Sequence, residues 1–327
     1  MIIGSFMPKG SSLWAGRLET LSARFPNHEF ILDPKDAEAK IADLDGLLGG
    51  RLDHELFERA ASLKAVFVPF TGLNHLPVAR LRERGVRAFN VHGNAESVAE
   101  RALAMTLAHY GRLVEYHNDL KIKQWHGFWV GKGAEDEWSS IFRRKTAILG
   151  TGAIGIALAR LLKGFDCEVV GYRRRADEPL PPSFDRIETD IATAVASAEI
   201  VFIALPLTPR TKGLFSKELL LSMKGKFLVN VGRGDIVDEE GLYLALSTGV
   251  LRGAAIDTWY QYPQGGSTIG APSRYPLHEL PNVILSPHVG GSTSEANVIA
   301  AEQTVENIAQ WLEMGSCSRE GNLAEMY

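Results

Sequence analysis

The chain has 327 residues, of which 45% are hydrophobic and 23% charged, as in an ordinary folded protein. Length alone predicts about two domains of about 150 residues each. Lysine and arginine number 35 against 39 for aspartate and glutamate, a net charge of −4. This balance argues against nucleic acid as a partner and against a polybasic membrane anchor.

The two cysteines, Cys167 and Cys317, form no CxxC pair. We therefore expect no disulfide framework and no metal site. Residues 1–6 carry no basic segment, and no stretch reaches the roughly 18 apolar residues of a membrane helix. These features predict a cytoplasmic protein without a membrane partner.

Short apolar runs alternate with amphipathic stretches in the first hundred residues. The strand-like runs are residues 2–6, 46–48, 65–68 and 86–89. Helical patterns lie between them, at residues 13–25, 54–61 and 78–84. This alternation predicts an α/β fold with a parallel sheet covered by helices on both faces.

A longer helical pattern covers residues 95–124, where Val98, Leu103, Leu107 and Leu113 keep roughly helical spacing. Its length suits a connector between two lobes. Glycines and mixed charge in residues 125–138 then predict a loop.

A second alternating series begins at Lys145. Its strand-like runs are residues 146–149, 168–172, 200–204, 227–230, 253–256 and 283–285. Residues 260–281 are rich in glycine, proline and serine and predict an irregular loop. A last helix is expected at residues 294–314. The second series therefore predicts a second α/β unit.

Residues 150–155 read GTGAIG and stand between a predicted strand and a predicted helix at residues 153–162. Glycines in this context allow a tight turn and close approach of the backbone to a pyrophosphate, which the helix N-terminus then binds. The motif favours a dinucleotide site. The alternative is a tight turn without a ligand.

Residues 172–175 read YRRR, and Arg173 follows Gly155 by 18 residues. An acidic residue near this position binds the ribose 2′-hydroxyl of NAD, whereas arginine suits the 2′-phosphate of NADP. Arg173 and Arg174 therefore favour NADP(H), with NAD(H) as the other cofactor to consider. A solvated basic turn is the alternative.

Two further strand ends carry chemistry. Residues 229–238 read VNVGRGDIVD, and Arg233 suits a substrate carboxylate held by two parallel hydrogen bonds. Residues 285–291 read LSPHVGG, and His288 suits proton transfer near neutral pH. Spacing alone leaves a surface salt bridge for Arg233, and a structural role for His288, as alternatives.

Together these motifs resemble the D-isomer-specific 2-hydroxyacid dehydrogenases, which include glyoxylate/hydroxypyruvate reductases, phosphoglycerate dehydrogenases and formate and phosphite dehydrogenases. The resemblance covers nearly the whole chain. It includes residues 71–74 (TGLN), 94–100 (NAESVAE), 205–211 (LPLTPRT), 253–257 (GAAID) and 280–291 (LPNVILSPHVGG).

The resemblance implies two doubly wound domains with the active site in the cleft between them. A flavodoxin-like substrate domain would comprise residues 1–96 and 297–327. An inserted Rossmann dinucleotide-binding domain would comprise residues 97–296. Members of the family usually dimerise through the dinucleotide domain, so a homodimer is expected.

The resemblance also assigns roles to residues. Arg233 takes the place of the arginine that binds the substrate, and His288 that of the proton-transferring histidine. Backbone amides of Gly72, Leu73 and Asn74 match the loop that binds the substrate carboxylate. The motifs and the resemblance together predict a cofactor site made of Gly150, Gly152, Ala153, Ile154, Gly155, Arg173, Arg174, Leu205, Pro206, Thr211, Val231, Gly232, Asp257, His288 and Gly290.

One position departs from the family pattern. The usual members carry a glutamate five residues after the aspartate that matches Asp257, and this chain has Tyr262 there. The formate dehydrogenases carry a glutamine instead, with a tryptophan in the place of Trp259. A neutral phenol does not favour imidazolium as a carboxylate does. We therefore expect His288 to lose its proton more easily, and reduction to decline at lower pH, than in relatives with glutamate.

Two alternatives bear on Tyr262: its loop lies outside the site, or another carboxylate such as Glu279 fills the role. The leading hypothesis is an NADP(H)-preferring reductase of small 2-oxo acids that forms D-2-hydroxy acids. A formate- or phosphite-type dehydrogenase and a dinucleotide-sensing binding protein are the rivals.

Overall fold

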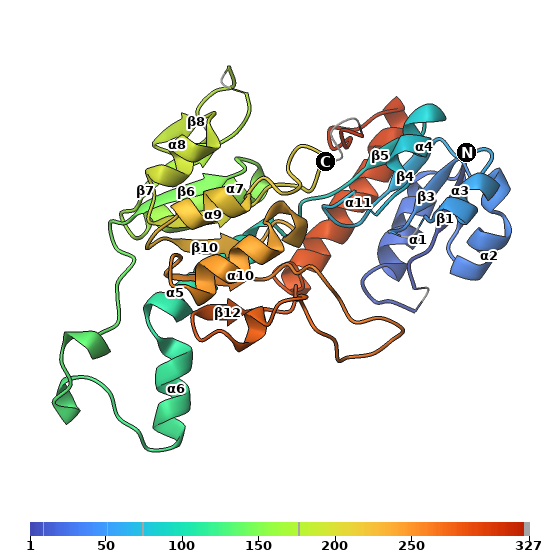
Figure 1. Ribbon diagram of the computed structural model, residues 1–327. Helices are drawn as coiled ribbons and strands as arrows, with labels where there is room; N and C mark the ends of the chain where they lie inside the picture. The colour runs from blue at the N-terminus through green and yellow to red at the C-terminus, as the bar shows by residue number, and fades with distance from the viewer. Residues whose placement is uncertain (9, 51, 74, 176, 324–327) are drawn as a thin grey trace. The chain divides into compact units, whose positions relative to one another are not determined.

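The computed structural model describes residues 1–8, 10–50, 52–73, 75–175 and 177–323. The chain forms two compact units. Unit 1 comprises Met1–Asn94 and the chain from Ser292 onward, and unit 2 comprises Ala95–Gly291. Each unit is a parallel sheet with interleaved helices (Figure 1), which confirms the predicted α/β class with two doubly wound domains.

Unit 1 is built on five parallel strands in the order β2-β1-β3-β4-β5, the flavodoxin-like order. Gly4 of β1 pairs with Ile31 of β2 and Leu47 of β3. The strands are β1 (Ile2–Ser5), β2 (Glu29–Ile31), β3 (Gly46–Leu48), β4 (Ala65–Phe67) and β5 (Arg87–Phe89). The helices are α1 (Ala15–Arg24), α2 (Pro34–Ala39), α3 (His54–Arg59), α4 (Val78–Glu83), α11 (Ser294–Met314) and the 3₁₀ turn η1 (Ile41–Asp43).

Short capping side chains begin helices α2 and α3 of unit 1. The Asp33 carboxylate accepts the Lys35 N–H before α2, and the Asp53 carboxylate accepts the Leu56 N–H before α3. The strands between these helices are almost wholly apolar because both faces of the sheet are covered. On one face, Trp311 of α11 packs edge-on against Phe67 at a ring distance of 5.5 Å.

Unit 2 is built on seven parallel strands in the order β12-β11-β10-β9-β6-β7-β8. The order reverses between β6 and β9, as it does in the Rossmann fold. The strands are β6 (Lys145–Leu149), β7 (Glu168–Tyr172), β8 (Arg186–Glu188), β9 (Ile200–Ile203), β10 (Phe227–Asn230), β11 (Gly253–Ile256) and β12 (Val283–Leu285).

Helices cover both faces of this sheet. Alternate residues of β6 enter separate cores: Ala147 and Leu149 pack on one face, and Ile148 on the other. The helices are α5 (Ala95–Tyr110), α6 (Leu113–Lys121), α7 (Ala153–Lys163), α8 (Ile191–Ala196), α9 (Lys217–Ser222) and α10 (Glu239–Ser247). The 3₁₀ turns are η2 (Phe128–Val130), η3 (Ala134–Asp136), η4 (Gly234–Ile236) and η5 (Leu277–Glu279).

The prediction of one helix over residues 95–124 was wrong. Helix α5 ends at Tyr110, and α6 begins at Leu113. Between them, Arg112 has a φ of 51°, in the left-handed region that ends a helix. Two short edge strands, β2 and β8, were not predicted. Within the described residues, no helix is long and apolar enough to cross a membrane.

Candidate active site at the carboxyl edge of the seven-stranded sheet

All seven strands of unit 2 run parallel, so their carboxyl ends share one edge of the sheet. Ligands of doubly wound folds bind at this edge, close to the point where the strand order reverses. The loops after β6, β7, β9, β10, β11 and β12, together with the first turn of α7, carry every residue of unit 2 that the sequence predicts for the site.

The first loop is the glycine turn after β6. Gly150 has a φ of 107°, and a Cβ there would lie 2.6 Å from the Ala204 carbonyl oxygen. A Cβ at Gly155 would lie 2.0 Å from the Gly150 carbonyl oxygen. Both positions therefore require glycine, which lets α7 start directly against the strand end.

The N-terminus of α7 suits a pyrophosphate. Gly152 is its N-cap, and in the described chain no side chain caps the helix. A Cβ at Gly152 would meet nothing within 4 Å. The first amides of the helix, including those of Ala153 and Ile154, are thus open to an anion. Among all the residues that the structure describes, no group of three His, Cys, Asp or Glu side chains could hold a metal ion.

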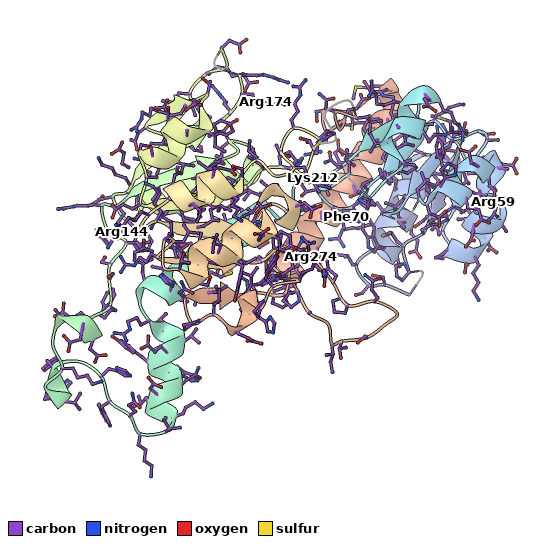
Figure 2. The ribbon with its side chains drawn as sticks, viewed as in Figure 1. Arg59, Phe70, Arg144, Arg174, Lys212 and Arg274 are labelled. Carbon is purple, nitrogen blue, oxygen red and sulfur yellow. The ribbon has the colours of Figure 1, made fainter. Side chains whose placement is uncertain are left out.

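The second loop follows β7 and carries Arg173 and Arg174. The Arg173 guanidinium donates to the carbonyl oxygens of Glu178 and Pro179 and pairs with the Glu178 carboxylate at 3.4 Å. Its buried Nε has no hydrogen-bond partner within the described ranges. Arg174 is exposed on the same loop (Figure 2). Phosphate binding by Arg173 would require the guanidinium to exchange its contacts with Glu178.

The third loop follows β9. The Thr211 hydroxyl donates to the Pro206 carbonyl oxygen at 2.6 Å and accepts the Thr208 N–H at 2.8 Å. These bonds fix the turn that begins at Leu205 and Pro206. Thr211 thus stabilises the turn that the sequence predicts to lie against the cofactor.

The fourth loop follows β10 and presents Arg233. The Asn230 side chain donates to the Arg233 carbonyl oxygen and accepts the Gly232 N–H, both at 3.0 Å. Val231 and Gly232 are buried. In the described structure no carboxylate pairs with the guanidinium, which donates to the Gly232 carbonyl oxygen at 2.7 Å. Burial lowers the pKa of Arg233. The salt-bridge alternative for Arg233 therefore fails.

Asp257 joins the fifth loop to the sixth. Its carboxylate is 2% exposed and accepts the N–H groups of Val289 and Gly290, both at 3.0 Å, and the Ser286 hydroxyl. Between these partners lies His288, with a φ of 59°. This left-handed conformation costs a non-glycine residue on the order of 1–3 kcal/mol, and such strain typically marks a functional site.

Tyr262 lies directly against His288. Its hydroxyl oxygen is 2.8 Å from His288 Nδ1 and accepts the Trp259 backbone N–H at 3.0 Å. The Trp259 indole N–H in turn donates to the Ser286 carbonyl oxygen at 2.8 Å. The alternative of a displaced loop is therefore wrong. Glu279 is exposed and lies 3.8 Å from its neighbour His278.

Burial and charge act on this pair in opposite directions. Burial lowers the pKa of His288, the Arg233 charge lowers it further, and Asp257 opposes both. Burial raises the pKa of Tyr262, while the Trp259 N–H and Arg233 oppose the rise. Both side chains are therefore neutral at physiological pH.

The irregular segment that carries Tyr262 is anchored by a buried carboxylate. Glu239 of α10 accepts hydrogen bonds from the Ser273 hydroxyl at 2.9 Å and from the Arg274 backbone N–H at 2.7 Å. It also accepts Arg274 Nε at 2.6 Å (Figure 2). Sequence reasoning missed this anchor because Glu239, Ser273 and Arg274 belong to none of the motifs. It also gave no role to Asn230 and Ser286, although both stand inside motifs, because their hydrogen bonds appear only in the structure.

The predicted carboxylate loop belongs to unit 1. Leu73 is fully buried there, and Gly72 is half-buried. The loop is held by the Thr71 hydroxyl, which lies 3.1 Å from the Val91 carbonyl oxygen and 2.8 Å from the Asn94 side-chain oxygen. Asn74 lies outside the described residues. The roles of these three residues stay predictions.

A Rossmann sheet with an open glycine turn, and with arginine and histidine on nearby strand ends, defines a dinucleotide-dependent oxidoreductase. The chain belongs to the D-isomer-specific 2-hydroxyacid dehydrogenase family. The family model described as "D-isomer specific 2-hydroxyacid dehydrogenase, NAD binding domain" matches residues 103–290. The protein is thus an NAD(P)-dependent enzyme of this family.

Relatives of known name support the assignment. A glyoxylate/hydroxypyruvate reductase B of Pectobacterium carotovorum is 31% identical over 301 residues, covering 89% of this chain and 90% of that protein. A glyoxylate reductase of Thermofilum pendens is 31% identical over 288 residues, covering 86% and 80%.

Solved structures share the fold. A Pyrococcus horikoshii protein has a TM-score of 0.81 and 25% identity, over 98% of this chain and 95% of that one. A Sinorhizobium meliloti NADPH-dependent glyoxylate/hydroxypyruvate reductase, solved with NADP and malonate, has a TM-score of 0.76 and 25% identity, over 99% and 98%.

Proposed function

We propose that the protein reduces small 2-oxo acids to D-2-hydroxy acids and prefers NADPH to NADH. The observation that carries this proposal is the pair of Arg233 and His288 at one sheet edge. Arg233 is a half-buried cation without a carboxylate partner in the described structure, so it suits an acid substrate. The named reductases among the relatives point to the same substrate class.

Arg233 would bind the substrate carboxylate and stabilise the charge that develops on the carbonyl oxygen. His288 would place a proton on that oxygen. Asp257 would hold the His288 loop in place through the Val289 and Gly290 amides. Gly72, Leu73 and Asn74 would add backbone donors for the carboxylate.

The glycine turn fits the pyrophosphate of a dinucleotide, whose reduced nicotinamide supplies the hydride when bound. Gly150, Gly152 and Gly155 would allow the approach, and the first amides of α7 would bind the phosphates. Arg173 and Arg174 would bind the 2′-phosphate after Arg173 releases Glu178. The NADPH-dependent S. meliloti relative supports this preference.

The proposed function is tested by following NADPH and NADH oxidation with glyoxylate, hydroxypyruvate, pyruvate and bulkier 2-oxo acids. We expect turnover with a small 2-oxo acid and a higher kcat/KM with NADPH. Turnover of formate or phosphite instead would support the dehydrogenase rival. Cofactor binding without turnover on any acid would support the sensor.

Replacement of Arg173 by alanine tests the cofactor preference. We expect KM for NADPH to rise by about tenfold or more, because a charge-assisted phosphate contact contributes roughly 1.5–3 kcal/mol. KM for NADH should change little. Arg143→Ala is the matched control, since Arg143 is exposed and precedes β6 at the opposite sheet edge. An equal loss with both cofactors would contradict the 2′-phosphate role.

We further propose that the protein is a homodimer formed through an arm, residues 111–142 of unit 2. Figure 1 shows α6 and the following turns extending away from the sheet of this unit. Large apolar side chains are exposed along the arm: Leu113, Val114, Leu120, Ile122, Trp125, Phe128, Trp129, Val130, Trp138 and Phe142. An apolar surface of this kind marks a protein interface, and a second copy offers the same arm in a two-fold arrangement.

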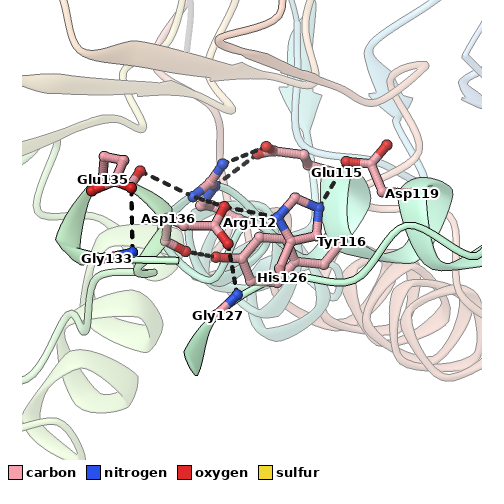
Figure 3. Close-up of polar contacts among 9 residues, drawn as sticks. All are labelled: Arg112, Glu115, Tyr116, Asp119, His126, Gly127, Gly133, Glu135 and Asp136. Atoms are coloured by element: carbon pink, nitrogen blue, oxygen red, sulfur yellow. Dashed lines mark hydrogen bonds and ion pairs between the residues drawn. The ribbon is translucent and has the colours of Figure 1, made fainter. Parts of the chain in front are cut away.

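Five charged side chains of the arm, Arg112, Glu115, Asp119, His126 and Asp136, form one network (Figure 3). The His126 ring lies 2.8 Å from the Asp136 carboxylate and 2.9 Å from that of Asp119. The bond to Asp136 raises the pKa of His126, and Asp119 adds to the rise. Tyr116 stacks on the ring at 4.5 Å and donates to the Asp136 carbonyl oxygen. This network holds the arm together, and the apolar side chains of the arm are exposed to solvent.

Trp129 is the most exposed tryptophan of the arm, at 78%. We expect Trp129→Asp to weaken the dimer by about 30-fold or more, since a central aromatic at an interface contributes roughly 2 kcal/mol or more. Light scattering after size exclusion would show one chain instead of two. Ile269→Asp, at an 86% exposed apolar position outside the arm, is the control. A wild type that is monomeric, or a Trp129→Asp variant as dimeric as the control, would contradict the interface.

A further inference from the structure

The Tyr262 hydroxyl has two hydrogen-bond partners, Trp259 and His288. The oxygen accepts the Trp259 backbone N–H at 3.0 Å. It also lies 2.8 Å from His288 Nδ1. A phenol has a single hydrogen, and a backbone N–H accepts nothing. Nδ1 is an acceptor within reach of that hydrogen, at 2.8 Å, and on this ground we assign the direction from the Tyr262 hydroxyl to Nδ1.

This direction determines the tautomer of His288. A neutral imidazole carries one hydrogen, and Nδ1 must be bare to accept from Tyr262. The hydrogen then resides on Nε2, the other nitrogen of the ring. A glutamate in place of Tyr262 can only accept, so it would hold the hydrogen on Nδ1. In the neutral ring, Tyr262 thus favours the tautomer opposite to the one that a glutamate would favour.

We propose that Tyr262 and His288 form an uncharged proton relay. Neutral His288 donates its Nε2 proton to the substrate, and Tyr262 donates its hydroxyl proton to Nδ1. This inference rests on the proposed reduction of a 2-oxo acid. Tyr262 acts through His288, so it is a positioning and proton-supplying residue that need not touch the substrate.

The step balances in atoms and charge. The substrate carbonyl gains hydride at carbon from the reduced cofactor and a proton at oxygen from His288 Nε2. The Nε2–H bond breaks as the O–H bond of the product forms. The Tyr262 O–H bond breaks as an Nδ1–H bond forms, leaving tyrosinate. A proton from water then adds to Nε2, which leaves hydroxide in the solvent, while the Nδ1 proton returns to Tyr262.

Two neighbours of Tyr262 partly offset the effect of its burial. The Trp259 N–H and the positive charge of Arg233 stabilise tyrosinate and lower the pKa of Tyr262 against the effect of its burial. Asp257 and Asp235 are the carboxylates that act against it. Tyr262 is 42% exposed and His288 is exposed as well, so water can supply the proton that returns to Nε2.

Both His288 and Tyr262 stay neutral over a wide range of pH. Burial and Arg233 lower the pKa of His288 from an ordinary value of about 6.5. Burial raises the pKa of Tyr262 from about 10. A mechanism that needs imidazolium would decline above the lowered histidine pKa, as the sequence led us to expect. The relay instead remains competent until Tyr262 ionises.

The test is the pH profile of kcat for reduction in the wild type and two variants. We expect a wild-type plateau from about pH 6.5 to at least about pH 10, because the pKa of Tyr262 is raised above its ordinary value. Tyr262→Phe removes the proton supply, so its kcat should fall about tenfold per pH unit above the lowered histidine pKa. Tyr262→Glu restores a carboxylate, and its decline should begin at higher pH than that of Tyr262→Phe.

Tyr260→Phe is the matched control, because the buried Tyr260 hydroxyl has no hydrogen-bond partner in the part of the chain that is described. Its profile should equal that of the wild type. A wild-type profile that declines together with that of Tyr262→Phe would overturn the relay.

Nitrogen-15 NMR of His288 gives a readout that needs no turnover. At about pH 8 we expect Nδ1 bare and Nε2 protonated in the wild type, and the loss of that preference in Tyr262→Phe. A proton on Nδ1 in the wild type would overturn the relay even if the protein is a reductase. If His288 shows the expected tautomer but the protein reduces no 2-oxo acid, the proposed function is contradicted instead.

Discussion

Arg233→Ala lowers kcat/KM for 2-oxo acids by on the order of 10³-fold, because one cation serves two tasks. It binds the carboxylate in the ground state and stabilises the carbonyl oxygen as charge develops. Both KM and kcat should therefore change. Stopped-flow measurement of NADPH oxidation separates the two effects, since the decay of bound NADPH reports reduction itself.

Arg233→Lys is the informative companion variant. It keeps the charge but loses the planar fork, so it should recover only part of the activity. NADPH binding, followed by fluorescence, should stay within about threefold of wild type in both variants. Unchanged kinetics in Arg233→Ala would refute the substrate role. A loss confined to cofactor binding would show that Arg233 binds the nucleotide instead of the substrate.

His288→Asn lowers kcat by about 10²- to 10⁴-fold, the usual contribution of a positioned proton donor. Asparagine is the suitable replacement because it tolerates the left-handed conformation of position 288, where φ is 59°. KM for the 2-oxo acid should change far less than kcat, since the proton transfers only in the transition state.

The control for His288→Asn is thermal unfolding with and without NADPH. An unchanged Tm and an unchanged shift on NADPH addition would show that the Asp257 contacts and the fold are intact. A kcat within about threefold of wild type would exclude His288 as the proton donor.

The regular elements of the fold were predictable because their apolar runs are continuous. Strand β7 and helix α11 have the bounds that the sequence predicts. The three-residue edge strands β2 and β8 were missed, since a run that short and partly polar resembles a loop. The break between α5 and α6 was missed because the apolar spacing continues past Gly111, and only the left-handed Arg112 reveals it.

The site was predictable where a motif dictates backbone geometry. Gly150 and Gly155 stand where a Cβ would strike carbonyl oxygens, so the sequence pattern and the structure agree for a physical reason. The contact of Tyr262 with His288 could not be read from the sequence, because it depends on the path of an irregular loop that Glu239 anchors. The contact between Arg173 and Glu178 depends likewise on a turn without a motif.

The most direct test of the account is the fate of deuterium from NADPH labelled at C4 of the nicotinamide. Wild-type enzyme is incubated with hydroxypyruvate and with NADPH that carries deuterium on one face of the nicotinamide ring or, in a second sample, on the other face. The product is analysed by mass spectrometry and chiral chromatography. The account predicts one deuterium at C2, from one labelled face only, in a product of D configuration. An L product, or a product without deuterium from either face, would contradict it.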